Sequence, residues 1–432
     1  MENEFKNTNS TNDAQEPRYN SYTWLKGNTI KFANLLHHRV IPEFMGTVKK
    51  LKDKFNHTHI ILDFSEVDKV GTSPAAPIAA CIDYYKSKGI TFEVIGANRY
   101  LLKTRFHSPT APSGPTKRNF LDRVWCFNNS IDVFNIGNGI ISSVRKATPC
   151  ENGVIQSCDW GINEIMDNVI QHSEIKRGFV MAQITNNRQV LNVCIVDYGV
   201  GIHETLRDTD PFPRNDIDAI SLSVREGKKG AKSTGQGNGM WGLYNIVNHN
   251  EGHLTIISGG GGIYFREDKT KAFRSTVYLD KQNKGTFVNF RINLQKETLL
   301  TTAIKGYTFP DLYIEDLEDD KGNTVFKINE VASGTGTRES GKEIRNELIN
   351  IYNITKKPIK VDFAQVGIIT SSFADELIGK LIIHYGFFQY QQIFRLANMN
   401  PTIQSILHRS IGQRFAEDYG SASYKSPEED HS

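Results

Sequence analysis

One short pattern occurs twice, towards the two ends of the chain. The segments IILDFSEVDKVGTS (60–73) and IKVDFAQVGIITSS (359–372) align without a gap, so that Asp63 precedes Asp362 by 299 positions. In each copy, an apolar run closed by Asp-Phe predicts a buried strand, and the small and apolar residues that follow predict a helix ending at a glycine. A second strand predicted at 92–95 implies a parallel pair with the first. An internal duplication accounts for the pattern, and chance agreement of two Asp-Phe strand ends is the alternative.

The length of the chain agrees with a repeated unit on each side of a larger middle block. The chain has 432 residues, and at roughly 150 residues per domain this suggests about three domains. The expected division, in order, is a disordered segment 1–20, an α/β domain 21–115, a middle domain 116–298, a linker 299–322, an α/β domain 323–415 and a disordered acidic tail 416–432.

Composition excludes several classes of protein. The net charge is only +3 and the hydrophobic fraction is 38%, which favours folded domains and gives no basis for nucleic-acid binding. No apolar run approaches the ~20 residues of a membrane span, and the N-terminal residues lack the apolar stretch of a signal peptide. The five cysteines are scattered without a Cys-x-x-Cys pair. We therefore expect a cytoplasmic protein without disulfides and without a membrane partner.

The middle block reads as several helices with a run of mostly antiparallel strands. Helices are predicted at 120–145, 161–174 and 242–252, strands at 179–185, 190–196, 253–258 and 285–292, and a long glycine- and lysine-rich loop at 203–238. This pattern predicts an α+β sandwich, which gives the whole chain an α+β class with a central sandwich between two small α/β domains.

A polar stripe occupies one face of the second predicted helix. Glu164, Asn168 and His172 are each four residues apart, a spacing that places them one above another on one side of a helix. The apolar residues of this helix lie on other faces. The stripe is either a solvated surface or the wall of a polar site.

Two glycine-containing segments follow the stripe. Asp197 ends a predicted strand and is followed by Gly199 and Gly201, an arrangement that lets a carboxylate accept a hydrogen bond beside open backbone, although an ordinary turn has the same pattern. The segment from Lys232 to Gly242 then places Gly237 and Gly239 before a helix, where backbone N–H groups can hold phosphate. A solvated loop is the alternative. A Walker A loop is excluded because alanine, not glycine, precedes Lys232.

These segments together resemble the Bergerat-fold (GHKL, histidine-kinase-like) ATPases, the family of gyrase B, heat-shock protein 90, MutL and histidine kinases. NEIMDN resembles the family's N-box, DYGVGI its first glycine box, GNGMWGL its second glycine box and KGTF its final Gly-Thr strand, in the family's order. The resemblance covers residues 159–293. It implies ATP and Mg²⁺ as cofactors.

The resemblance also implies a role for each matching residue. Asn168 would coordinate Mg²⁺, Asp197 would accept the adenine amine with support from Thr286, and Glu164 would be the general base. The other residues implied to bind ATP are His172, Gly199, Gly201, Lys232, Gly237, Gly239 and Gly242. The sequence departs from the family pattern between Gly239 and Gly242, where two residues stand in place of one.

The resemblance extends to the variant of the site and to the flanking domains. The Glu-x-x-x-Asn-x-x-x-His stripe resembles the anti-sigma-factor serine kinases, and the segment VDFAQVGIITSSFADELIGKL resembles the STAS-like antagonists on which such kinases act. IILDFSEVDKVGTSPAAP is a weaker match to the same fold. Ser73 and Ser372 stand near the antagonists' phosphoacceptor position, and the alternative is that they only cap a helix.

Three functions remain open from the sequence. The first is a regulatory Mg-ATP-dependent protein kinase or partner switch, with a serine- or histidine-kinase-like phosphotransfer. The second is an ATP-gated conformational switch or slow ATPase of the gyrase and MutL type, in which water is the acceptor. The third is a nucleotide-binding scaffold that has lost catalysis. We expect ATP and a protein partner or a second copy of the chain as binding partners.

Overall fold

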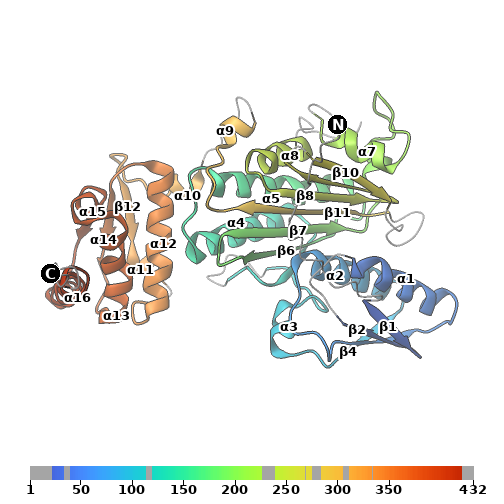
Figure 1. The fold of residues 1–432 in the computed structure, drawn as a ribbon, viewed down its shortest axis with the longest axis horizontal. Helices are drawn as coiled ribbons and strands as arrows, with labels where there is room; N and C mark the ends of the chain where they lie inside the picture. Colours follow the sequence, from blue (N-terminus) through green and yellow to red (C-terminus); the bar gives the residue numbers. More distant parts are fainter. Residues whose placement is uncertain are drawn as a thin grey trace, which may run out of the picture.

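The chain forms three α/β units in sequence, each with its own sheet (Figure 1). The computed structural model describes residues 22–33, 39–112, 119–225, 239–267, 269–274, 284–304, 311–332 and 334–420. The N-terminal domain lies against the central sheet, and the C-terminal domain lies beside a helix of the central domain (Figure 1).

The N-terminal domain is a four-stranded sheet with helices. Its strand order is β1-β2-β3-β4, and only the pair β1 and β2 is antiparallel. The strands are β1 (Thr23–Lys26), β2 (Thr29–Phe32), β3 (His59–Asp63) and β4 (Thr91–Ile95), and the helices are α1 (Val40–Asp53), α2 (Thr72–Ser87) and α3 (Arg99–Thr104). The predicted strand, helix and parallel second strand of the first repeat are confirmed.

The C-terminal domain has the same core topology in a smaller sheet. Its three parallel strands, in the order β12-β13-β14, are β12 (Thr324–Lys327), β13 (Ile359–Asp362) and β14 (Phe394–Ala397). The helical segments are α11 (Ile328–Val331), α12 (Arg338–Thr355), α13 (Ser371–Ala374), the π-helical turn η1 (Asp375–Gly379), α14 (Lys380–Tyr385), α15 (Phe387–Ile393) and α16 (Pro401–Gly420). Helix α16 continues past residue 415, where the sequence suggested that the domain ends.

The two domains share a hydrogen-bonding pattern as well as a topology. Asn98 and Asn400 each follow the last parallel strand, and each side chain donates to two carbonyls of the loop after the repeated strand while accepting one helix N–H. The partners are Val67 O, Asp68 O and Leu101 N for Asn98, and Val366 O, Gly367 O and Ile403 N for Asn400. Chance agreement of two short segments does not account for this network, which supports the predicted duplication.

The central domain is a seven-stranded antiparallel sheet in the order β10-β9-β8-β11-β7-β6-β5. Its strands are β5 (Val124–Phe127), β6 (Gly178–Thr185), β7 (Val190–Asp197), β8 (His253–Ser258), β9 (Gly261–Arg266), β10 (Lys269–Arg274) and β11 (Thr286–Asn293). Its helices are α4 (Ser130–Ala147), α5 (Val154–His172), α6 (Ile202–Thr205), α7 (Asp216–Ser223) and α8 (Gly239–His249). Apolar residues of α4, α5 and α8 pack with the sheet in one core, which gives a helix-on-sheet sandwich.

Three sequence predictions for this domain were wrong in detail. The helix predicted at 120–145 is a strand, β5, followed by α4, because the short apolar run VWCF has no periodicity that separates a buried strand from a helix. The loop predicted at 203–238 contains α7, which Asn215 caps by accepting the N–H of Asp218. Strands β9 and β10 were not predicted.

The two flanking domains join the central domain through different chemistry. Helix α2 packs against β6 and β7, and the apolar residues of both sides form one continuous cluster that includes Phe179 and Val196. Helix α12 packs against α4 instead, and side-chain amides carry much of that contact. Between the central and C-terminal domains, the expected linker contains α9 (Leu300–Ala303) and α10 (Leu312–Glu315).

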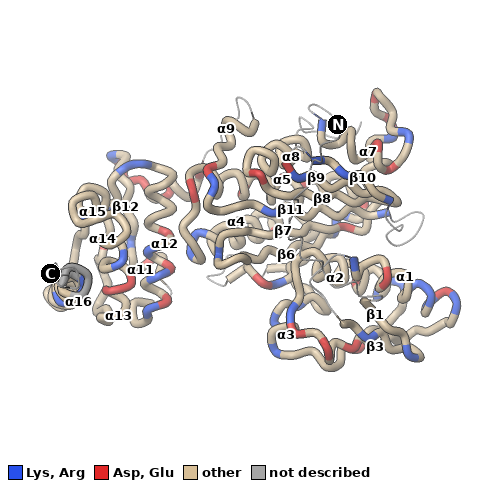
Figure 2. The backbone as a smooth tube through the Cα atoms, in the orientation of Figure 1, with Lys and Arg blue, Asp and Glu red and all other residues tan. Residues whose placement is uncertain are grey.

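Other sequence-level expectations concern charge, cysteines and membranes. Basic and acidic residues are interspersed over all three domains (Figure 2). All five cysteines are buried free thiols. Within the described ranges, no helix combines the length and the apolar character that a bilayer crossing requires.

Candidate functional site

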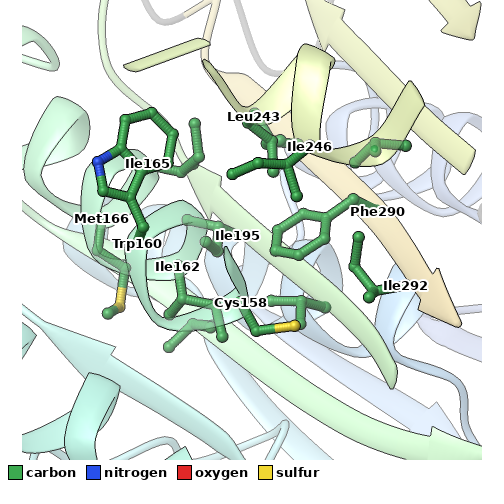
Figure 3. Packing of buried hydrophobic residues seen from close by; sticks show 14 of the residues in the cluster. Cys158, Trp160, Ile162, Ile165, Met166, Ile195, Leu243, Ile246, Phe290 and Ile292 are labelled. Atoms are coloured by element: carbon green, nitrogen blue, oxygen red, sulfur yellow. The ribbon is translucent and has the colours of Figure 1, made fainter. Parts of the chain in front are cut away.

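Helix α5 carries the predicted polar stripe and anchors it in the core. Apolar side chains of α5 pack against β7, β11 and α8, as the cluster around Ile165, Ile195 and Leu243 shows (Figure 3). This packing fixes the rotation of the helix. Glu164, Asn168 and His172 consequently share a half-buried face, so the stripe is not a fully solvated surface.

The first residue of α8 lies directly against this stripe. A Cβ atom at Gly239 would stand 2.7 Å from Glu164 Oε2 and 3.1 Å from Asn168 Nδ2. Any other residue would therefore push the carboxylate or the amide aside. The structure thus brings together three of the predicted site residues from two helices that are separated in sequence.

The local environment changes the protonation of the stripe. Burial, with a smaller contribution from the neighbouring Asp167 carboxylate, raises the pKa of Glu164. Burial also lowers the pKa of His172, which favours the neutral imidazole. A carboxylate whose pKa is raised in a partly dry site is suited to accept a proton.

Asp197 ends β7 and is 4% exposed. Its Oδ1 accepts the N–H of Gly199 at 2.7 Å, and its register partner on β11, Thr286, also donates a hydrogen bond to the carboxylate. Burial outweighs these bonds and raises the pKa of Asp197 to about 7. The carboxylate is therefore poised between its neutral and ionised forms near physiological pH.

The glycines after Asp197 allow close backbone contacts. A Cβ at Gly199 would lie 2.1 Å from the carbonyl oxygen of Ser173, just after α5, and Gly201 has φ +82°, which favours glycine. Gly285 N–H donates to Gly199 O at 2.8 Å, and Ser258 Oγ donates to Gly285 O at 2.9 Å. The end of α5, the loop after β7 and the start of β11 are thus held together.

Other predicted residues lie elsewhere. Gly242 faces Trp160 and Ile304, with a Cβ position 2.1 Å from the Trp160 ring, so its small size serves helix packing. Lys232 and Gly237 lie outside the described residues.

Ser73 and Ser372 are half-buried residues near the starts of α2 and α13. Neither caps its helix: the N-cap positions are Gly71 and Thr370, and Thr370 Oγ1 accepts the N–H of Phe373 at 3.2 Å. The alternative that these serines only cap helices is therefore wrong. The neighbouring Ser371 is exposed, whereas Thr72 is buried.

Sequence reasoning missed a polar bridge behind the Asp197 loop. Tyr198 O–H donates to Asp83 of α2 at 2.8 Å, and Arg177 donates two hydrogen bonds to the same carboxylate, each at 2.9 Å. Strand alternation favours opposite faces of the sheet for Asp197 and the next residue, but it does not indicate the partner of Tyr198. The bridge connects the N-terminal domain to the loop that follows Asp197.

Comparison with known proteins identifies part of the chain. Residues 340–404 match the family model described as a STAS-like domain of unknown function (DUF4325). The match spans most of α12, the repeated strand β13 and the beginning of α16. A search of curated proteins gave no match. The C-terminal domain thus contains a STAS-like domain in a chain of mixed α/β structure.

Proposed function

We propose that the central domain binds Mg-ATP and that the protein is a regulatory ATP-dependent protein kinase or partner switch. The observation that carries the proposal is the close approach of Gly239, the first residue of α8, to Glu164 and Asn168 on α5. An anionic ligand at the start of α8 would meet backbone N–H groups and the positive end of the helix.

The chemistry of the residues fits the proposed ligands. The amide oxygen of Asn168 is a suitable donor for Mg²⁺, which prefers oxygen ligands and would neutralise phosphate charge when bound. Asp197, in its ionised form, would accept the exocyclic amine of adenine. Thr286 and Gly199 already donate to this carboxylate, so its orientation is fixed before any ligand arrives.

Glu164 is the proposed general base. It would take the proton of an acceptor hydroxyl while the oxygen of that hydroxyl forms its bond to the γ-phosphorus and the bond from phosphorus to the leaving diphosphate breaks. His172 stays neutral at the end of the stripe. A base of this kind acts in the transition state and contributes little to ground-state binding.

The flanking domains are the proposed protein side of the switch. The N-terminal domain shares the topology and asparagine network of the C-terminal domain, which supports a STAS-like fold for both. Ser372 is the better acceptor candidate, because Thr370 and Ser371 beside it are exposed. A phosphate there would add about −1.5 to −2 charge and change the surface that a protein partner contacts.

The decisive experiment incubates the full chain with γ-labelled Mg-ATP and measures protein-bound label, free phosphate and ATP affinity. We expect label on the protein, mapped by phosphopeptide analysis to the segment that contains Ser372. Glu164→Gln should bind ATP normally and lose ~10²–10⁴ in rate. Asp167→Asn, which neutralises a neighbouring carboxylate on α5, is the matched control and should keep its rate.

The other outcomes separate the alternatives. Free phosphate without protein label would favour the ATP-gated switch or slow ATPase, and binding without turnover would favour the inactive scaffold. Absence of any Mg-ATP binding in calorimetry would refute the assignment itself.

A further inference from the structure

Helix α12 presents three asparagines to the central domain. Asn346, Asn350 and Asn353 lie along one side of α12. Their side chains donate to backbone carbonyls at the end of α4 and just after it, at distances of 2.8–3.0 Å: Asn346 to Lys146 O, Asn350 to Arg145 O and Thr148 O, and Asn353 to Cys150 O. We call these three asparagines the docking face.

The docking face complements the end of a helix. The last carbonyls of an α-helix have no partner within the helix, and Asn350 supplies donors to two carbonyls at the end of α4. Its Oδ1 also accepts the N–H of Cys150 at 2.6 Å. The contact therefore matches backbone groups, which water can satisfy equally well when the two surfaces separate.

A charged cluster lies beside the docking face. Arg145 is 6% exposed, its guanidinium lies 4.1 Å from the Tyr313 ring centroid, and it contacts Asp311 at 3.4 Å. Tyr313 O–H donates to Glu347 of α12 at 2.5 Å. Within the described residues, three buried atoms here lack a hydrogen-bond partner: Arg145 Nε, Glu347 Oε2 and Gln156 Oε1.

These unpaired atoms weaken the docked state. A buried polar atom without a partner loses its hydration and gains nothing in return, whereas separation of the surfaces restores water to it. Among the described residues, Ile354 is the one partly buried apolar residue that packs against both the central and the C-terminal core clusters.

The N-terminal interface has the opposite character. Its apolar residues from α2, β6 and β7 belong to one cluster with fully buried members such as Ile78 and Phe179. Opening that interface would expose a large apolar surface to water, which is strongly unfavourable. The two interfaces therefore differ in how readily they separate.

We propose that the C-terminal domain undocks reversibly from α4 as a unit, while the N-terminal domain stays fixed to the central sheet. The docking face is a surface for the C-terminal turn of a helix, and its occupant in the closed chain is α4. The docking face contacts α4, and α4 in turn packs against α5, the helix that carries Glu164. The proposal does not depend on nucleotide binding.

The test is a distance measurement in the full chain with pairs of spin labels. All five native cysteines are buried, so labels react selectively with exposed introduced cysteines. The test pair is Asn138→Cys on α4 with Gln389→Cys on α15, and the control pair is Asn138→Cys with Lys49→Cys on α1; all three sites are exposed. We expect two distance populations for the test pair and one for the control pair.

Asn350→Ala removes three hydrogen bonds across the interface and should increase the open population about tenfold. Asn346→Ala, which removes the single hydrogen bond to Lys146 O, is a second, milder variant that should shift the population in the same direction. Asn400→Ala, which weakens the C-terminal domain internally, should leave the open population of the test pair unchanged. One narrow distance in both wild type and Asn350→Ala, or equal broadening of both pairs, would overturn the proposal.

Discussion

The two flanking domains have the same fold but present different helices to the central domain. The N-terminal domain uses α2, which follows the repeated strand, and the C-terminal domain uses α12, which precedes it. Sequence composition explains the choice. Helix α2, with the sequence TSPAAPIAACIDYYKS, consists mostly of small and apolar residues, whereas α12 carries asparagines at its docking face.

This difference shows that fold and attachment are separate properties of a duplicated domain. The Asp-Phe strand and the hydrogen bonds of the asparagine after the last strand belong to the fold that both copies share. Side chains outside that pattern determine how each copy contacts the central domain. One consequence concerns the segment after the repeated strand. Thr72 is buried in the N-terminal domain, whereas Thr370 and Ser371 are exposed in the C-terminal domain, so the two copies are unequal candidates for modification.

The largest expected effect tests whether the N-terminal and central domains unfold together. Phe179 of β6 is fully buried in the cluster that both domains share. Phe179→Ala should destabilise both by ~3–5 kcal/mol. Phe326→Ala, at a fully buried position of the C-terminal core, is the matched control and should destabilise its own domain alone.

Tryptophan fluorescence in urea separates these two outcomes. All four tryptophans lie in the N-terminal and central domains, at positions 24, 125, 160 and 241. Phe179→Ala should shift the fluorescence transition, and Phe326→Ala should shift only the far-UV signal of the remaining domain. A fluorescence shift of equal size in both variants would show that the chain is one cooperative unit.

The second prediction concerns pH, to which the stability of the two units should respond differently. The pKa of Asp197 is about 7 in the folded state, above its unfolded value, so its contribution to stability is present at acid pH and is lost as pH rises through 7. Fluorescence-detected stability should therefore fall between pH 5.5 and 8, by on the order of 2 kcal/mol. Asp197→Asn should remove this slope.

In the C-terminal domain, burial acts to raise the pKa of Glu376. Hydrogen bonds and charge from Lys380 and Arg345 outweigh burial, so this pKa lies below its ordinary value. That contribution to stability is present above the unfolded pKa and is lost only as pH falls through the lowered value. The C-terminal transition should thus be insensitive to this group between pH 5.5 and 8.

On the proposed function, ATP affinity should rise over the same range, because the ionised Asp197 accepts the adenine amine. An affinity that is flat with pH in wild type would count against that role.

The third prediction compares one matched substitution at each interface. Tyr198→Phe removes a hydrogen bond to the Asp83 carboxylate, worth ~1.5–3 kcal/mol, directly after Asp197 in the chain. It should lower the fluorescence-detected stability and weaken ATP binding. Tyr313→Phe removes the corresponding bond to Glu347 and should change neither quantity. Calorimetric titration of both variants makes the comparison, and equal losses of affinity would contradict a special role for the N-terminal interface.

Much of the fold followed from patterns that have one physical interpretation. Apolar runs closed by Asp-Phe, helical spacing around Ile165 and the order of polar segments predicted the repeated units and placed Glu164 and Asn168 on one helix face. Strand β5 could not be recognised in this way, because VWCF is buried on both sides and carries no alternation.

The contacts between domains could not be predicted, because they join residues far apart in sequence whose types are common. The sequence around Asp83 or Asn350 does not indicate which residue each will contact. Their hydrogen-bond partners become neighbours only when separate elements pack together. Gly242 shows the reverse case. Its place in the glycine-rich segment suggested a ligand, but the structure places it against Trp160. Glycine alone does not distinguish a ligand contact from a close helix contact.

The smallest expected effect tests the duplication itself. Asn98 and Asn400 make equivalent hydrogen bonds, and each caps the helix that follows, so Asn98→Ala and Asn400→Ala should each cost ~1 kcal/mol. If the domains differ only in how they attach to the central domain, both variants should lose the same stability, but only one of them should affect the central domain. Asn98→Ala should lower the fluorescence-detected transition, because its domain shares a core with the central sheet, and Asn400→Ala should leave that transition in place. Hydrogen exchange of peptides from α3 and α16 supplies the local measure, since both variants should accelerate exchange in the helix they cap. A large loss for one asparagine and none for the other would mean that the shared network is a structural likeness without equal energetic weight.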